Sequence, residues 1–148
     1  ALYLASLFPI NGFVAAGTVL KFNNHFTINY IVPIICHFLP TRSKNKFNPS
    51  NAVHFYGYES YPLKALNQFK KMNNKIIPLL KKIKVPGMLI HSNLDRMSIK
   101  ENIDIIKNNI VNKNIKTLFV EKAHHNMFDK NPDQKFIFNE VLQFLNSH

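Results

Sequence analysis

Residues 86–98, PGMLIHSNLDRMS, decide the fold of this chain. Gly87–His91 is a continuous strand-like run, which is typical of a strand in a parallel sheet covered on both faces. The polar loop that follows carries an acid, Asp95, just past the end of the run. Ser98-x-x-Glu101 has the pattern of a capping box, which predicts the start of a helix. The stretch therefore predicts a strand, a polar loop and a helix in that order.

The same order continues towards the C-terminus. Isoleucines recur at helical spacing after the capping box, at positions 99, 103, 106 and 110. Lys116–Val120 (KTLFV) is the next strand-like run, and His125 lies in the polar loop after it. Asn131 and Pro132 predict the start of a last helix, because proline is favoured in the first helical turn. We expect its buried stripe to consist of Phe138, Val141, Leu142 and Leu145.

The N-terminal half begins with regular elements and then changes character. Ala1–Phe8 is typical of the end of a helix, and Gly12–Ala16 (GFVAA) of a short buried strand. Residues 21–74 lack the alternation of strands and helices, and aromatic residues and prolines interrupt them. We therefore expect an α/β chain with a doubly wound, mostly parallel sheet. Its core would comprise residues 1–20 and 75–148, with a helical cap inserted at 21–74.

The composition sets limits on the class of protein. A chain of 148 residues with 46% hydrophobic residues is long enough for a globular domain with a sizeable core. No stretch approaches the roughly 18 apolar residues that a membrane-spanning helix needs. Cys36 is the only cysteine, which excludes an intrachain disulfide and a cysteine zinc cluster. A single cysteine fits a reducing cytoplasm, where we expect the protein.

The formal net charge of +11 makes anionic partners worth considering. The lysines are spread along the whole chain, and no nucleic-acid-binding signature accompanies them. We therefore expect no nucleic-acid partner, and at most a weak contact with an anionic membrane surface. His25, His37 and His54 have no repeated metal-ligand spacing, so we expect no metal site.

Asp95 and His125 are the residues that point to chemistry. In open α/β sheets, ligands bind beyond the carboxyl ends of the strands, where both residues are expected. An acid that orients a histidine forms two thirds of a serine-hydrolase triad. No serine of this chain lies in the G-x-S-x-G setting of a nucleophile. The alternative is that Asp95 is a turn residue and His125 an ordinary polar loop residue.

Three motifs resemble those of the α/β-hydrolases. His91–Asp95 (HSNLD) resembles the G-x-x-D acid loop, with Ser92 where glycine is usual. Glu121–Phe128 (EKAHHNMF) resembles the G-x-G-H histidine loop. Tyr58–Leu66 (YESYPLKAL) resembles the Y-x-x-x-P-L-K-A stretch that leaves the cap of carboxylesterases and monoacylglycerol lipases. Each motif is short, but their order and spacing extend the resemblance over nearly the whole chain.

The resemblance implies a serine-type ester hydrolase with a lid, similar to carboxylesterases or monoacylglycerol lipases, that acts on small esters or acylglycerols. Asp95 matches the triad acid and His125 the triad base. His124 occupies the position of a family glycine and is the alternative base. Ala1–Leu7 looks like the helix after the nucleophile elbow, so the serine is expected before Ala1. The resemblance implies no cofactor, and we expect the 148 residues alone to be inactive.

Two alternative functions remain open. The same fold also supports cleavage of amides, thioesters or carbon–halogen bonds. The residue at the elbow would discriminate among these, because serine, cysteine and aspartate carry different chemistry. The second alternative is a non-catalytic binding module or a degenerate fragment on the same scaffold.

Overall fold

The computed structural model describes residues 1–43 and 60–148. Its elements, in chain order, are α1 (Leu2–Leu7), β1 (Phe13–Ala16), η1 (Thr27–Ile31), α2 (Val32–Ile35), β2 (Thr41–Ser43), β3 (Ser60–Pro62), α3 (Leu63–Leu79), η2 (Leu80–Lys82), β4 (Gly87–Ser92), α4 (Glu101–Asn109), β5 (Ile115–Val120) and α5 (Gln134–Asn146). None of the helices in these ranges is long and apolar enough to cross a membrane.

The chain divides into two compact units. The first consists of Ala1–Asn23 and Asn73–His148 and contains β1, β4 and β5 with their helices. The second, Asn24–Met72, contains η1, α2, β2 and β3. The long helix α3 contributes its N-terminal part to the second unit and its C-terminal end to the first.

Three parallel strands form the sheet of the first unit, in the order β1-β4-β5. Phe13 of β1 lies opposite Gly87 of β4, and Ser92 of β4 lies opposite Val120 of β5. A Cβ atom on Gly87 would lie 2.3 Å from the ring of Phe13. Because Gly87 has no side chain, the ring of Phe13 can occupy this space.

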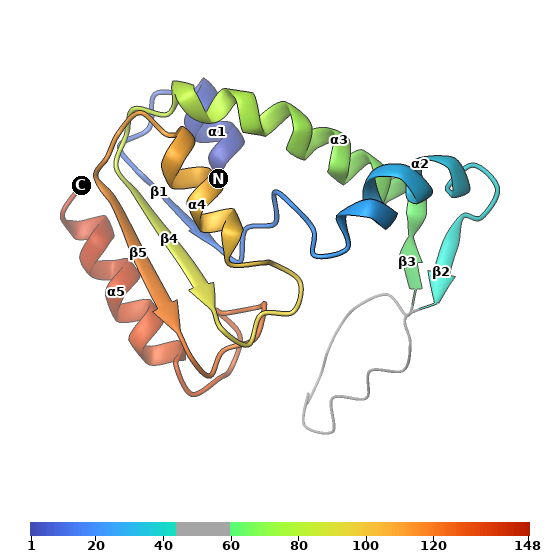
Figure 1. Ribbon diagram of the computed structural model, residues 1–148. Coiled ribbons are helices and arrows are strands. Elements are labelled where there is room, and N and C mark those ends of the chain that lie inside the picture. The colour runs from blue at the N-terminus through green and yellow to red at the C-terminus, as the bar shows by residue number, and fades with distance from the viewer. Residues whose placement is uncertain (44–59) are drawn as a thin grey trace. The chain divides into compact units, whose positions relative to one another are not determined.

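Side chains alternate between two hydrophobic clusters on the two faces of the sheet, as the period of a strand requires. α1, η2 and α4 pack on one face through the buried residues Leu2, Ala5, Leu80, Ile83, Ile103 and Ile106. α5 packs on the other face through Ile137 and Phe144, against Met88, Ile90 and Val120. Helices thus cover both faces of a parallel sheet, which is the expected doubly wound arrangement (Figure 1).

The last helix differs from the sequence prediction in its start and its buried stripe. α5 begins at Gln134 with Asp133 at the N-cap, and Asn131 lies in the turn before it. Its buried side chains are Ile137 and Phe144, with Val141 partly buried. The predicted stripe residues Phe138, Leu142 and Leu145 are exposed. Both apolar stripes of this helix have helical spacing. The period of the sequence therefore does not determine which stripe packs against the sheet.

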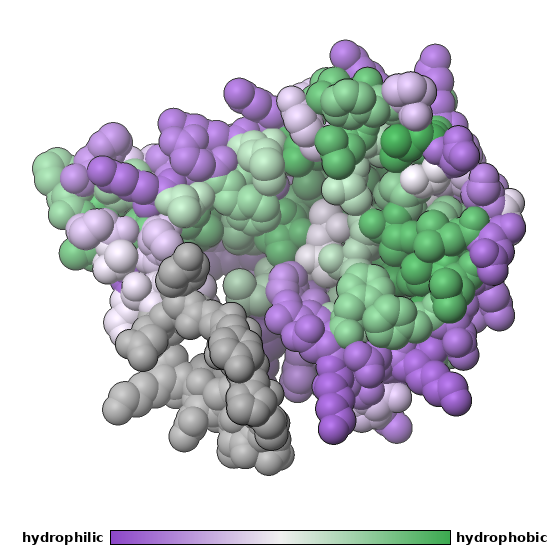
Figure 2. Space-filling view, turned by 180° about the vertical axis from the view of Figure 1, so that it is seen from behind, coloured by the Kyte–Doolittle hydropathy of each residue, from purple (hydrophilic) through white to green (hydrophobic). Residues whose placement is uncertain are grey.

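Exposed apolar side chains of α5 contribute to the apolar surface of the first unit; they are Phe136, Phe138, Leu142 and Leu145. In the space-filling view, hydrophobic side chains gather on the surface of the first unit, and hydrophilic ones border them (Figure 2).

Two further local predictions were wrong. Ser98 does not cap α4, because its hydroxyl donates to the carbonyl oxygen of Thr18 at 2.6 Å and the N-cap residue is Lys100. The pattern of Ile76–Lys82 (IIPLLKK) predicts a separate short helix, whereas these residues form the end of α3, which begins at Leu63, and the whole of η2. Asparagines are buried in α3 together with apolar residues. The asparagines interrupt the apolar period from which a helix is predicted.

The second unit is built from short elements. β2 and β3 form an antiparallel pair, and the N–H of Leu63 donates to the carbonyl oxygen of Pro40. Cys36 is buried, and the Nδ2 atom of Asn67 lies 3.5 Å from its sulfur. His54 and the start of the Tyr58–Leu66 motif lie outside the described residues.

Candidate active site

The carboxyl ends of β4 and β5 lie at the same level of the sheet, because Ser92 and Val120, the last residues of the two strands, are partners in the parallel register. The N–H of Asn93 continues the pairing by donating to the carbonyl oxygen of Val120 at 3.0 Å. The loop after β4, residues 93–100, carries Asp95 and is called the acid loop here. The loop after β5, residues 121–130, carries His125 and is called the histidine loop. The register thus places the two loops side by side.

The side chains of Asp95 and His125 meet directly. Nδ1 of His125 lies 2.9 Å from Oδ2 and 3.1 Å from Oδ1 of Asp95. Because a carboxylate only accepts hydrogen bonds, this contact requires the proton on Nδ1. The Asp95 side chain is 0% exposed and that of His125 is 36% exposed. Among the residues that the structure describes, none hydrogen-bonds to Nε2, so the neutral imidazole has its accepting nitrogen available.

The backbone of its own loop holds the Asp95 carboxylate in place. Oδ1 accepts hydrogen bonds from the N–H groups of Met97 and Ser98, at 2.8 and 2.9 Å. The N–H of Asp95 itself donates to the carbonyl oxygen of Ser92 at 3.1 Å, which closes the turn after β4. A buried carboxylate needs such donors, since an unpaired buried charge is costly. The loop therefore fixes the oxygen atoms that face the imidazole.

Polar side chains from the start of α5 hold the histidine loop. Oδ2 of Asp133 accepts hydrogen bonds from the N–H groups of Glu121 and Lys122, at 3.1 and 2.6 Å. Nδ2 of Asn131 donates to the carbonyl oxygen of Met127 at 2.9 Å, and the Met127 side chain is 1% exposed. The loop is thus anchored on both sides of His125.

Gly17 lies against the imidazole of His125, a role that the sequence analysis missed. Its N–H donates to the carbonyl oxygen of Ile90 at 3.0 Å, and its φ of +56° is in the region that favours glycine. A Cβ atom there would lie 3.2 Å from Nδ1 and Cε1 of the imidazole and 3.1 Å from the His125 carbonyl oxygen. The available signal was a glycine at a strand end beside the predicted site.

The structure distinguishes the two neighbouring histidines. His124 is exposed and makes no hydrogen bond within the described ranges, whereas His125 contacts Asp95. Residues 1–43 and 60–148 contain no group of three histidine, cysteine, aspartate or glutamate side chains that could hold a metal ion.

A third histidine, His91, is buried near this pair. It is 3% exposed and packs edge-on against Phe119, with ring centroids 6.2 Å apart. Its Nδ1 atom has no hydrogen-bond partner among residues 1–43 and 60–148. Burial lowers the pKa of this imidazole below 6.5; the Asp95 carboxylate opposes the shift, and the Lys100 ammonium adds to it. His91 is therefore neutral at neutral pH.

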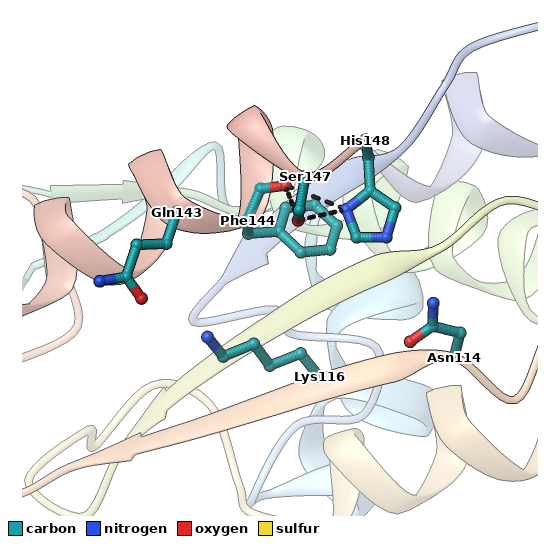
Figure 3. Close-up of a pocket in the computed structure, with 6 residues that line it drawn as sticks. All are labelled: Asn114, Lys116, Gln143, Phe144, Ser147 and His148. Carbon is teal, nitrogen blue, oxygen red and sulfur yellow. Dashed lines mark hydrogen bonds between the residues drawn. The ribbon is translucent and has the colours of Figure 1, made fainter.

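A surface hollow with a volume of about 310 Å³ lies at the other end of β5. It is lined by Asn114, Lys116, Gln143, Phe144, Ser147 and His148 (Figure 3). The hydroxyl of Ser147 donates to the carbonyl oxygen of Phe144, and Lys116 forms an ion pair with Glu140 at 2.7 Å. Asn114 and Lys116 mark the amino end of the strand, whereas ligands of open α/β sheets bind at the carboxyl end. The Asp95–His125 pair is therefore the better candidate site.

Comparison by sequence gives no identification, since no family model and no curated protein sequence matches the chain.

Comparison by structure gives a consistent result. The chain is similar to a metagenome-derived lipolytic enzyme from work on LipS and LipT, with a TM-score of 0.81 and 19% identity. It is also similar to the monoacylglycerol lipase of Paleococcus ferrophilus (TM-score 0.77, 15% identity) and to a soluble variant of the monoglyceride lipase of Saccharomyces cerevisiae (TM-score 0.73, 14% identity). In each comparison 99% of this chain is covered.

The chain spans only part of these structures, namely 60%, 63% and 60% of their lengths. At identities below one fifth, the similarity bears on the fold and leaves the activity to be argued from the site. The parallel sheet, its helices on both faces and the lipase and esterase neighbours together establish that this chain has the α/β-hydrolase fold.

Proposed function

We propose that this chain supplies the acid and the base of a serine-type ester hydrolase. The observation that carries the proposal is the contact of 2.9 Å between the buried Asp95 carboxylate and Nδ1 of the partly exposed His125. An oriented histidine with its second nitrogen available is what a hydroxyl nucleophile requires. Lipases and esterases among the structural neighbours support an ester as the substrate class.

In the proposed reaction, a serine hydroxyl attacks the ester carbonyl carbon while Nε2 of His125 takes its proton. The alcohol leaves with that proton, and water then hydrolyses the acyl-enzyme by the same route. Asp95 keeps the proton of the neutral imidazole on Nδ1 and stabilises the imidazolium that forms. The serine and the N–H donors for the oxyanion would come from a part of the protein outside this chain.

Ser92 and Ser98, which lie at the start and near the end of the acid loop, are poor candidates for this nucleophile. The hydroxyls of Ser92 and Ser98 donate to the backbone carbonyl oxygens of Ala123 and Thr18. Ser92 is 0% exposed and Ser98 is 2% exposed. A nucleophile must be accessible to the substrate, so the proposal assigns neither serine that role.

We further propose that the second unit, Asn24–Met72, corresponds to the cap expected at residues 21–74. Its surface is rich in exposed apolar side chains, among them Phe26, Tyr30, Ile34 and Phe38. Such side chains suit a substrate with an acyl chain, which favours monoacylglycerols and other carboxylic esters.

The test is hydrolysis of a p-nitrophenyl ester and of a monoacylglycerol by the complete protein. We expect His125→Ala to lower kcat by roughly a thousandfold or more, because proton transfer is lost. His124→Ala is the matched control, since this neighbour is exposed, and we expect it to keep kcat within about threefold. Circular dichroism checks that both variants fold. Equal activity of wild type and His125→Ala would refute the proposal.

The rival reactions on the same fold require a substrate panel. An amide, a thioester and a haloalkane of matched size should be turned over more slowly than the ester. Covalent labelling by a fluorophosphonate, which reacts with activated serine, should require His125 as hydrolysis does. Faster turnover of the haloalkane without labelling would favour an aspartate nucleophile. No turnover of any substrate would favour a binding module.

A further inference from the structure

Ser92 lies where the acid loop meets the histidine loop. It is the last residue of β4, and it is 0% exposed. Its hydroxyl donates to the carbonyl oxygen of Ala123 and accepts a hydrogen bond from the N–H of Leu94 at 3.1 Å. One side chain thus contacts the backbone of both loops.

The position of these contacts links them to the Asp95–His125 pair. Leu94 is the residue before Asp95, and Ala123 is two residues before His125. Ala123 is itself fully buried, so its carbonyl oxygen depends on a protein donor. Removal of the Ser92 hydroxyl would therefore affect the backbone next to Asp95 and the backbone next to His125.

Other contacts between the two loops are weaker candidates for this role. The Nδ2 atom of Asn93 donates to Oε1 of Glu121 at 2.7 Å, but both side chains are exposed. Exposed hydrogen bonds compete with water and contribute little to position. Within residues 1–43 and 60–148, the Ser92 hydroxyl makes the one buried side-chain hydrogen bond between these loops apart from the Asp95–His125 contact itself.

We propose that Ser92 is a positioning residue that fixes the distance between the Asp95 carboxylate and the His125 imidazole. For catalysis this inference rests on the proposed hydrolase function. For the geometry of the pair it stands on the hydrogen bonds alone. Ser92 occupies the place where the acid loops that this chain resembles usually have glycine, so the hydroxyl is a feature of this sequence.

The contrasting role is purely structural, in which Ser92 satisfies the carbonyl oxygen of Ala123 and the N–H of Leu94 and nothing more. Both roles predict that Ser92→Ala lowers the melting temperature, since the buried C=O of Ala123 and the partly buried N–H of Leu94 lose their partner. Only the positioning role predicts a change in the imidazole while the protein is folded. The measurement must therefore report on the Asp95–His125 hydrogen bond directly.

The experiment is proton NMR of the complete protein, which reports the imidazole Nδ1 proton of His125 as a resonance downfield of the amides. Its assignment is checked by its loss in His125→Ala. We expect this resonance to be broadened or lost in Ser92→Ala and Ser92→Gly, at temperatures where circular dichroism shows a folded protein. We expect kcat for an ester to fall about tenfold in both, with KM changed less than about twofold.

Two further variants sharpen the test. Ser92→Thr keeps the hydroxyl and should restore the resonance and at least half of kcat. If the added methyl group prevents folding, Ser92→Cys, with a weaker donor of similar size, should give values between serine and alanine. Asn73→Ala is the matched control: Asn73 is 2% exposed and donates to the backbone carbonyl oxygens of Val19 and Leu20. It should lower stability but keep the resonance and kcat.

The outcomes separate this inference from the proposed function. If Ser92→Ala and Ser92→Gly keep both the resonance and kcat, the positioning role is refuted and the proposed function stands. If the wild type has no hydrolase activity but the resonance depends on the Ser92 hydroxyl, the proposed function fails and the positioning role stands. An equal loss of the resonance in Asn73→Ala would overturn the positioning role, because a general loosening of the fold would then explain it.

Discussion

Oδ1 of Asp95 accepts the N–H groups of Met97 and Ser98, and it also lies 3.1 Å from Nδ1 of His125, while Oδ2 lies 2.9 Å from the same nitrogen. Both oxygens of this buried carboxylate thus contact the imidazole, and Oδ1 alone of the two also accepts the backbone N–H groups of its loop. Oδ1 holds the loop, and Oδ2 makes the shorter contact with the imidazole. This division predicts what an amide would do at the same position.

In Asp95→Asn, we expect the amide oxygen to replace Oδ1, because only an acceptor can receive the Met97 and Ser98 N–H groups. The amide NH₂ would then face Nδ1 of His125 and force that nitrogen to accept. The imidazole proton would move to Nε2, which could no longer take a proton from the nucleophile. We expect kcat to fall by roughly a thousandfold or more, with an unchanged circular dichroism spectrum.

Asp129→Asn provides the control for this substitution. Asp129 is an exposed acid that follows His125, and its hydrogen bonds are made by its backbone: its N–H donates to the carbonyl oxygen of Asn126, and its carbonyl oxygen accepts from Nδ2 of Asn131. We expect its kcat to remain within about threefold of the wild type. A fully active Asp95→Asn protein would show that His125 needs no carboxylate, and the triad interpretation would then be abandoned.

At Gly17, a side chain would disturb the His125 imidazole. Gly17→Ala should cost about 1–2 kcal/mol of stability, because alanine is strained at a φ of +56°. Its Cβ atom would also press on the imidazole at 3.2 Å. Asparagine tolerates positive φ better than alanine but carries the same Cβ atom. We therefore expect Gly17→Asn to be more stable than Gly17→Ala while both lower kcat.

Melting curves measure the backbone strain at position 17, and ester hydrolysis measures the effect of the added Cβ atom on the His125 imidazole. Gly12→Ala is the control, since a Cβ atom there meets the carbonyl oxygen of Pro86 at 3.3 Å and lies away from His125. If both Gly17 variants keep the wild-type kcat, the close approach of this glycine has no bearing on the imidazole.

Much of the first unit could be predicted from the sequence because its signals are local. The apolar runs of β4 and β5 are continuous, and each is followed by a polar loop with one chemically distinctive residue, Asp95 or His125. Parallel strands of equal length bring such loops together at one edge. The contact between Asp95 and His125 therefore follows from the order of the elements, while its catalytic role remains a prediction.

The features that escaped prediction depend on contacts between distant segments. Ser98 has the local pattern of a helix cap, but its hydroxyl bonds to Thr18, 80 positions away. The buried stripe of α5 is set by the sheet face that it meets, which its own sequence does not specify. Gly17 and Ser92 act on loops that are distant in sequence, so their neighbours became evident only in the folded chain.

At Gly87, the pairing of β1 with β4 makes a stability prediction. The ring of Phe13 occupies the space where a Cβ atom of residue 87 would lie, at 2.3 Å. Gly87→Ala should lower the free energy of unfolding by about 1–3 kcal/mol, as overpacking of a core usually does. In a Phe13→Leu background the added methyl group has more room. We therefore expect the alanine to cost less there than in the wild type.

Urea denaturation of the four proteins in this cycle measures the coupling between residues 13 and 87. Additive effects of Gly87→Ala and Phe13→Leu would contradict the packing described for this strand pair. Circular dichroism of each protein before denaturation guards against a change of fold.

The last prediction concerns His91 and the pH dependence of stability. Burial lowers the pKa of its imidazole in the folded state below the ordinary value of 6.5, which the unfolded chain retains. As the pH falls through 6.5, the unfolded state therefore binds a proton more readily than the folded state, and the free energy of unfolding decreases. The titratable groups around it are Asp95, Lys100, Glu101 and His125, and they are unchanged in a His91→Gln protein. We expect the wild type to lose more stability between pH 7.5 and 5.5 than His91→Gln does, in urea denaturation at each pH. His124→Gln, which removes an exposed histidine, should keep the wild-type dependence. If His91→Gln also keeps it, the imidazole of His91 takes up its proton equally well in the folded and unfolded states, and burial does not hold it neutral.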